Sequence, residues 1–140
     1  MSDDERWVAD TSVAVAALDA AHGAHDPCRA IVQRHRPALA GHAAFEVYAV
    51  ITRMPGPAMV DPGDAARLIS RVFPHALWLS GDQQQHLRDR VATLGISGGA
   101  MYDALVGEAA RVHDAHLLTR DQRARRTYDL LGVDYTLVGS

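Results

Sequence analysis

A short apolar run that ends in an acid and leads into a helix occurs twice in this sequence, near each end of the chain. Residues 7–9 are apolar and precede Asp10, and the two residues after it, Thr11 and Ser12, favour a helix start. The second copy runs from His116 to Asp121. In an open sheet of parallel strands, ligand sites form just beyond the carboxyl ends of the strands. Both acids are therefore candidate site residues.

Between these two copies, segments with strand and helix patterns alternate, which predicts an α/β fold with a mainly parallel sheet. The chain is expected to form one domain over residues 1–140, with residues 1–5 as a disordered tail. We expect strands near residues 7–9, 38–41, 76–80, 116–119 and 134–138, and helices near residues 13–18, 27–36, 42–54, 65–73, 82–94, 100–110 and 122–131.

The composition indicates a protein that stays in the cytoplasm. Cys28 is the single cysteine, which excludes a disulfide within the chain and favours a reducing compartment. No run of about 18 uncharged apolar residues is present, so no membrane span is expected. The first five residues are acidic where a secretory signal would be basic.

Net charge argues against a protein that coats nucleic acid with its whole surface, because the formal charge is −3. Residues 111–126 differ, since five arginines stand there against two aspartates, a local balance of +3. Such a segment could form the rim that holds a phosphate-bearing ligand beside the acids, or it could be a solvated helix face.

Two further acids interrupt helices that are otherwise apolar. Glu46 lies in the middle of residues 42–54, which are apolar nearly all round and so predict a buried helix. An unpaired carboxylate there would cost several kcal/mol or take up a proton, so Glu46 needs a cation, either arginine or a metal. Asp103 lies in the first turns of its helix, where the positive helix end alone would favour an acid, but its apolar flanks favour a site.

If Asp10, Glu46, Asp103 and Asp121 converge, they cannot all stay ionised without a cation. One or two divalent ions would resolve this, and ligands that are all oxygen select Mg²⁺ or Mn²⁺ over Zn²⁺. Such an ion can activate and orient water and stabilise the leaving oxygen of a phosphodiester.

Two other chemistries are less well supported. His113 and His116 could bind a metal if both lay on one helix, but the chain is expected to turn from helix to strand between them. Asp10 could be a phosphorylated nucleophile, but that class needs a second acid two residues later, where this chain has Ser12.

Four motifs in order carry a family resemblance: Val-Ala-Asp-Thr-Ser near the amino terminus, an isolated glutamate in the third apolar helix, Tyr-Asp-Ala-Leu in a late helix, and Leu-Leu-Thr-Arg-Asp. Together they resemble the PIN-domain ribonucleases, and among these most closely the VapC toxins of toxin-antitoxin pairs. The resemblance implies a three-layer fold with a five-stranded, mainly parallel sheet flanked by helices. It also implies a Mg²⁺- or Mn²⁺-dependent endoribonuclease that inhibits growth or translation, a VapB-like antitoxin partner and a homodimer.

The resemblance also implies roles for individual residues. Asp10, Glu46, Asp103 and Asp121 match the acids that bind metal and catalyse hydrolysis to a 5′-phosphate and a 3′-hydroxyl, and hydroxyls matching the supporting positions are Thr11, Ser12 and Thr119. Arg120, Arg123 and Arg126 are the expected phosphate contacts, and the expected antitoxin groove is lined by Val15, Leu18 and Tyr48.

Two alternatives stay open beside the toxin hypothesis. One is a PIN-like nuclease that processes RNA, or cuts DNA, outside any toxin pair. The other is a metal-binding interaction module that never cuts. The RNA target also stays open between transfer RNA and ribosomal RNA.

Overall fold

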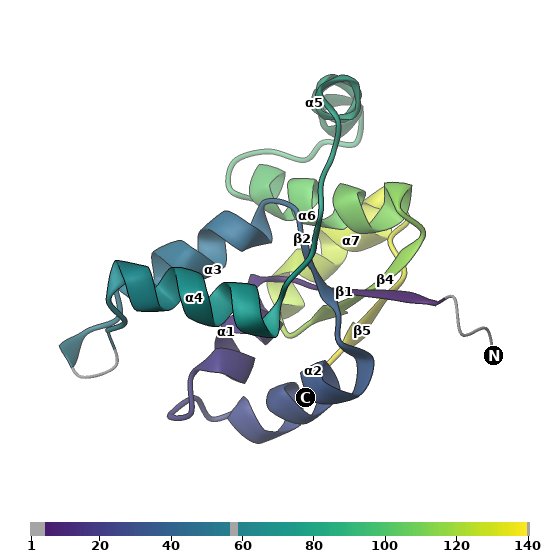
Figure 1. Cartoon of the computed structure of the whole chain (residues 1–140). Helices are drawn as coiled ribbons and strands as arrows, with labels where there is room; N and C mark the ends of the chain where they lie inside the picture. Colours follow the sequence, from purple (N-terminus) through teal and green to yellow (C-terminus); the bar gives the residue numbers. More distant parts are fainter. Residues whose placement is uncertain (1–4, 57–58, 140) are drawn as a thin grey trace.

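A five-stranded, all-parallel sheet forms the centre of the molecule. The structure is a computed structural model that describes residues 5–56 and 59–139 (Figure 1). The strand order is β3-β2-β1-β4-β5, and all four pairings are parallel. The strands are β1 Arg6–Ala9, β2 Ala38–Ala40, β3 Ala76–Leu77, β4 Ala115–Thr119 and β5 Tyr135–Leu137. The predicted α/β fold and five-stranded sheet are confirmed.

Seven α-helices and one 3₁₀ turn of the described chain connect the strands. They are α1 Thr11–Leu18, α2 His25–His35, α3 Ala43–Thr52, α4 Pro62–Val72, α5 Gly81–Thr93, α6 Ala100–Val112, η2 Gln122–Ala124 and α7 Arg125–Leu131. The predicted order is confirmed, with two local differences. Ser80, rather than Asp82, caps α5, because its hydroxyl accepts from the backbone N–H of Gln83 while the Gln83 side chain accepts from Ser80 N–H. The third strand, at the sheet edge, is shorter than expected.

Alternation along the two central strands divides the core into two halves. Val8 pairs with Leu117, and both face a cluster that includes α5, α6 and α7. Ala9 pairs with Leu118, and both face the cluster of α1, α2 and α3. Because successive strand residues point to opposite faces, the two short apolar strands cover both layers of helices.

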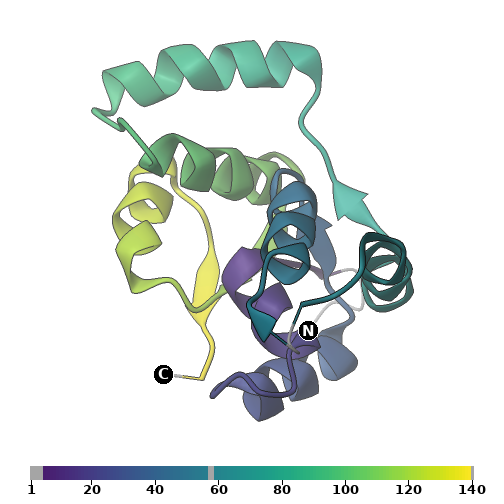
Figure 2. The same ribbon diagram turned by 90° about the vertical axis from the view of Figure 1, so that its left-hand side faces the viewer.

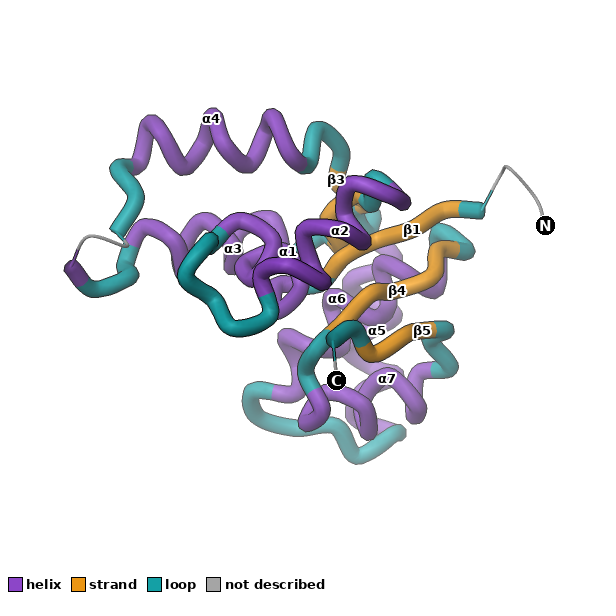
Figure 3. The backbone as a smooth tube through the Cα atoms, turned by 90° about the horizontal axis from the view of Figure 1, so that it is seen from below, coloured by secondary structure: helices purple, strands orange, loops and turns teal. Residues whose placement is uncertain are grey.

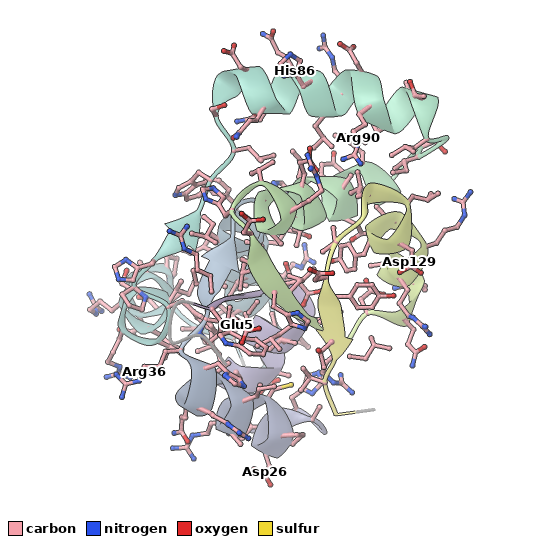
Figure 4. All side chains as sticks on the ribbon, turned by 90° about the vertical axis from the view of Figure 1, so that its right-hand side faces the viewer. Glu5, Asp26, Arg36, His86, Arg90 and Asp129 are labelled. Carbon is pink, nitrogen blue, oxygen red and sulfur yellow. The ribbon has the colours of Figure 1, made fainter. Side chains whose placement is uncertain are left out.

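Helix α5 is the outermost helix and lies along α6 (Figure 2). A buried acid, Glu108 on α6, ties it down by accepting from Arg90 Nη1 at 3.2 Å and from Arg111 Nε at 2.7 Å. Arg90 also donates to the carbonyl of Leu131 on α7 at 3.0 Å, and Figure 4 shows it reaching from α5 towards α6. One carboxylate and two arginines thus hold three helices together.

The prediction that the helix of residues 42–54 is buried all round is wrong. One side of α3 packs in the core, but Phe45 is 63% exposed and Tyr48 39% exposed. Phe45 instead lies against the exposed Trp78 with ring centroids 5.5 Å apart. Periodicity could not show this, because an exposed aromatic cluster and a buried one have the same pattern.

Two further expectations concern the amino-terminal tail and membrane-spanning helices. Residues 1–4 of the predicted tail lie outside the described part of the chain, and Glu5 within it is exposed. Among the described helices, none has the length and apolar character that a membrane crossing requires.

Candidate active site

Asp10 stands at the carboxyl end of β1 and is 4% exposed. It caps α1, since one carboxylate oxygen accepts from Val13 N–H at 3.1 Å and from the Ser12 hydroxyl at 2.6 Å. The other oxygen accepts from the hydroxyls of Thr119 and, at 3.3 Å, Tyr128. Burial raises the pKa of Asp10, and the bonds from Ser12 and Thr119 act against that rise.

The two hydroxyl residues join the ends of the neighbouring strands β1 and β4, which lie side by side in Figure 3. Ser12 Oγ accepts from the backbone N–H of Arg120 at 2.8 Å, and Thr119 Oγ1 accepts from that of Asp121 at 3.1 Å. A backbone N–H can only donate, so each hydroxyl is left to donate its own proton to Asp10. The carboxylate of Asp10 is therefore held in one orientation.

Asp121 follows β4 and caps the 3₁₀ turn, accepting from Arg123 N–H at 3.0 Å. Asp103 lies in the first turn of α6. Burial raises the pKa of Asp103 to about 6, and the charges of Asp121, Glu46 and Asp10 add to the rise, in that order. Asp103 thus lies close enough to the three other predicted acids to be affected by their charges, although the four come from separate parts of the sequence.

Glu46 lies at the rim of this acid cluster rather than in the core. Its side chain is 39% exposed, and Oε1 lies 3.8 Å from His42 Nε2, one turn earlier on α3. The His42 ring stacks on Tyr102, the residue before Asp103, with centroids 5.3 Å apart. The argument that Glu46 needs a cation because it is buried is therefore wrong, since water reaches this carboxylate.

The remaining predicted residues occupy different settings. The hydroxyl of Thr11 is buried without a hydrogen-bond partner among the described residues, whereas those of Ser12 and Thr119 are fully used. Arg123 is 97% exposed with Nε 4.0 Å from an Asp121 oxygen, and Arg126 is exposed on α7. The three predicted phosphate contacts stay a prediction, and of them Arg123 is the one paired with a site acid.

Arg120 and Val15 are at least partly covered, and their predicted roles stay predictions. The Nε of Arg120 is buried and without a partner among the described residues, and it lies beside Gly139 near the end of the chain. Val15 is 9% exposed within the core around α1. Of the three predicted groove residues, Leu18 and Tyr48 offer more surface to a partner.

Sequence reasoning missed Tyr128. Its ring is buried, and it fits because position 107 is glycine, where a Cβ atom would lie 2.9 Å from Tyr128 Cδ1. Burial and the nearby charge of Asp10 raise the pKa of Tyr128, so its hydroxyl stays a donor. A tyrosine on the inner side of α7 was the available signal, since a buried phenol needs a hydrogen-bond partner.

The side chains of His113 and His116 form hydrogen bonds within the fold. His113 Nε2 donates to the carbonyl of Trp78 at 2.8 Å, and His116 Nε2 lies 2.6 Å from Thr136 Oγ1. Helix α6 ends at Val112 and β4 begins at Ala115, so the chain turns from helix to strand between the two histidines, as expected.

The four acids have the donor chemistry that suits a divalent cation, because all of them offer oxygen and the charges of the other three act on Asp103. As the side chains lie, no three His, Cys, Asp or Glu residues within the described chain are arranged to hold one ion. The acids share a neighbourhood without forming a closed coordination shell. Holding an ion would thus require the more exposed carboxylates to turn towards Asp10.

Comparison with known proteins agrees with the architecture. The family model described as "PIN domain" matches residues 8–130. Ribonuclease VapC27 of Mycobacterium tuberculosis is 46% identical over 124 residues, covering 89% of this chain and 90% of the relative. Ribonuclease VapC40 of the same organism is 40% identical over 130 residues, covering 92% and 96%. The chain belongs to the PIN-domain family, as a VapC-type ribonuclease.

Solved structures show the same fold at low identity. The M. tuberculosis toxin VapC20, described as cleaving the sarcin-ricin loop, aligns with a TM-score of 0.66 at 14% identity and covers 86% of this chain and 93% of its own. VapBC2 of Rickettsia felis, bound to a DNA fragment of its promoter, aligns with a TM-score of 0.61 at 12% identity and covers 94% and 97%.

Proposed function

We propose that this chain is a metal-dependent endoribonuclease and the toxin of a toxin-antitoxin pair. The observation that carries the proposal is the fixed carboxylate of Asp10, set between the ends of β1 and β4 beside three further acids. The names of its relatives, Ribonuclease VapC27 and VapC40, support RNA as the substrate. The antitoxin partner is supported by the VapBC2 complex, which has the same fold.

In this proposal Asp10, Asp103 and Asp121 hold Mg²⁺ or Mn²⁺, and Glu46 either holds a second ion or positions water. The ion supplies charge that lowers the pKa of water and stabilises the leaving oxygen. The chain's own contribution is orientation, since Ser12 and Thr119 keep Asp10 in one position. Glu46, exposed at the rim, is accessible to the water that attacks the phosphorus. In the proposed step water adds to phosphorus opposite the 3′-oxygen and the bond from phosphorus to that oxygen breaks, so the products carry a 5′-phosphate and, once the leaving oxygen takes up a proton, a 3′-hydroxyl.

Cleavage of a panel of structured RNAs, including transfer and ribosomal RNA fragments, tests this proposal. With added Mg²⁺ or Mn²⁺ the purified wild-type protein cuts at least one RNA, and Asp10→Asn does not. Ends that carry a 2′,3′-cyclic phosphate would contradict the mechanism. Binding of metal without any cleavage would favour the alternative of a non-cleaving module.

The partners are a second copy of the chain and an antitoxin. The exposed pair of Phe45 and Trp78, whose rings lie 5.5 Å apart, offers apolar surface that association with the second copy would bury. We place the antitoxin at the groove lined by Val15, Leu18 and Tyr48, where Leu18 and Tyr48 are the more exposed residues. The substrate RNA implies the cytoplasm as the place of action. We expect Tyr48→Ala to lose affinity for the antitoxin while the fold stays intact. Unchanged affinity would contradict the assignment of Tyr48 to the antitoxin groove.

A small antitoxin-like reading frame beside the gene would separate this proposal from a nuclease that processes RNA outside a toxin pair. Without such a neighbour, and with cleavage still observed, the processing alternative would be favoured.

A further inference from the structure

A cavity of about 850 Å³ lies at the opposite edge of the sheet from the acids, where the strands begin. It is lined by the start of β1, the end of α2, the end of α4 and the residues before β3. Figure 4 looks at this face of the molecule, on which Glu5 and Arg36 are labelled. The volume lies within the range of pockets that hold small organic ligands.

The walls of this cavity combine cations with apolar and aromatic surface. Three arginines line it, Arg6, Arg36 and Arg71, together with two histidines and a single acid, Glu5. None of the ion pairs within the described part of the chain uses any of the three arginines. The charges of Arg6, Arg36 and Arg71 are therefore not paired with a carboxylate within the described part of the chain.

Trp7 gives the cavity a flat wall. Its ring stacks on His35 with centroids 3.9 Å apart and an angle of 20° between the planes, and it meets His116 edge-on. Trp7 is only partly buried and belongs to the lining. Stacked aromatic rings beside arginines are the surfaces on which proteins hold nucleobases and their phosphates.

Arg36 holds a backbone conformation that its residue type does not favour. It ends α2 with φ 46° and ψ 57°, the left-handed region in which glycine is the usual residue. An arginine at this position costs backbone energy relative to glycine. Strain of this kind is concentrated at functional sites, and here it sets a cation at the margin of the cavity.

Helix ends alone explain only part of this arrangement. His35 and Arg71 lie in the last turns of α2 and α4, where positive charge is favoured by the helix dipole. Arg6 lies at the start of a strand, and Arg36 lies beyond the last helical residue and under strain. No helix end explains Arg6, and the strained backbone of Arg36 is not required by the helix dipole.

We propose that this cavity binds a nucleoside phosphate, with the base against the Trp7–His35 stack and the phosphate at Arg36 and Arg71. The ligand can be a free mononucleotide or one nucleotide of an RNA strand. Only the RNA source depends on the proposed ribonuclease function, because binding of a mononucleotide needs no cleavage.

The fluorescence of Trp7 provides a direct measurement. The chain has two tryptophans, and Trp78 is outside the lining of this cavity, so Trp78→Phe leaves one reporter at the site. AMP, inorganic phosphate and a short single-stranded RNA are titrated separately into this protein. We expect AMP to change the Trp7 emission saturably and phosphate to compete with it. No change with AMP or with RNA would overturn the proposal.

Charge reversal tests the arginines. The double variant R36E/R71E in the Trp78→Phe background is expected to weaken AMP binding at least tenfold. R88E, on the exposed surface of α5, is the matched control and is expected to change affinity less than twofold. Equal weakening by both variants would show a non-specific charge effect and overturn the proposal.

Arg36→Gly separates ligand binding from a structural role. Glycine relieves the left-handed backbone, so the melting temperature is expected to rise by roughly 2–5 °C while AMP affinity falls several-fold. A lower melting temperature with unchanged affinity would show that Arg36 serves the fold, which would overturn its assignment to the ligand.

Two comparisons identify the source of the ligand. If R36E/R71E raises the KM of RNA cleavage at unchanged kcat, the ligand is a nucleotide of the substrate; unchanged cleavage with weakened AMP binding assigns a free mononucleotide. If the wild type cuts no RNA, the proposed function fails, but the AMP titration still decides the cavity. An acidic peptide that alters Trp7 emission when AMP does not would assign the site to a protein partner and overturn the proposal.

Discussion

Asp10 and Glu108 are buried to the same extent, each 4% exposed, but the protein compensates their charges in opposite ways. Glu108 accepts from two guanidinium groups, those of Arg90 and Arg111. Among the residues that the structure describes, the donors to Asp10 are all neutral, three hydroxyls and one backbone N–H. One buried acid is neutralised where it stands, and the other is oriented but left without a cation.

The difference indicates which buried acid belongs to a functional site. An ion pair such as that of Glu108 offers nothing further to a ligand, and its role is to join helices. A carboxylate that is oriented by hydroxyls and lies beside other acids retains an affinity for a cation from solution. The way in which a buried charge is compensated therefore carries more information than its burial.

The largest expected effect comes from Asp10→Asn. Cleavage should fall roughly 1,000-fold or more, because charge that supports the transition state is lost. The melting temperature should change little, because the cost of desolvating the charge is removed while the amide NH₂ group can no longer accept the hydrogen bonds that one carboxylate oxygen accepts. Cleavage rates and thermal melts measure the two. A variant that unfolds would instead place Asp10 in the same class as Glu108.

Glu108→Gln should show the reverse pattern. It leaves Arg90 and Arg111 without their shared counter-charge, and we expect unfolding to become easier by about 2 kcal/mol, less than for a fully buried pair, because both arginines are partly exposed. Denaturant titration measures this loss. Cleavage per folded molecule should be unchanged, with R88A as a surface control on the same helix as Arg90. Loss of activity in the folded variant would contradict the separation of roles.

Tyr128→Phe should sharpen the comparison by removing one neutral donor from Asp10. We expect a loss of about 1 kcal/mol, seen as weaker Mn²⁺ binding in calorimetry and roughly three- to tenfold slower cleavage. Tyr135→Phe is the matched control, since its hydroxyl donates to Asp129 instead. If both variants bind Mn²⁺ as the wild type does, the hydroxyl of Tyr128 has no positioning role.

The smallest effect concerns pH. The pKa of Asp103 is raised to about 6 from an ordinary value of 3.8, so between these values the folded protein binds more protons than the unfolded chain. Stability without metal should therefore fall as pH rises from about 4 to 6.5, by roughly 2–4 °C in melting temperature. Asp103→Asn should reduce this slope in melts with a chelator, and an unaltered slope would assign the titration to another group.

The order of the elements and the positions of the acids were predictable from the sequence. Asp10 and Asp121 follow short apolar strands, and parallel pairing of those strands brings them to one edge. The family motifs added Asp103 and Glu46 to the same region. The hydrophobic pattern, the parallel topology and the family motifs were sufficient to predict the element order and the positions of the four acids.

What the sequence could not show depends on which side chains remain at the surface. Phe45 follows the pattern of a core residue but is exposed, and Glu46 beside it is reached by water. Tyr128 contacts Asp10 across 118 positions of sequence, and no local pattern reports such a contact. The basic cavity has the same origin, since Arg6, Arg36 and Arg71 meet only in the folded chain.

The hydroxyl bond from Thr119 to Asp10 joins residues 109 positions apart. A ribosome adding about 5–20 residues per second needs roughly 5–20 seconds to make the intervening chain. During that interval Asp10 has no bond from Thr119 and β1 has no complete β4 beside it, although Glu46 and Asp103 join the chain before Thr119 does. The arrangement that orients Asp10 therefore cannot form until synthesis of the chain is almost complete.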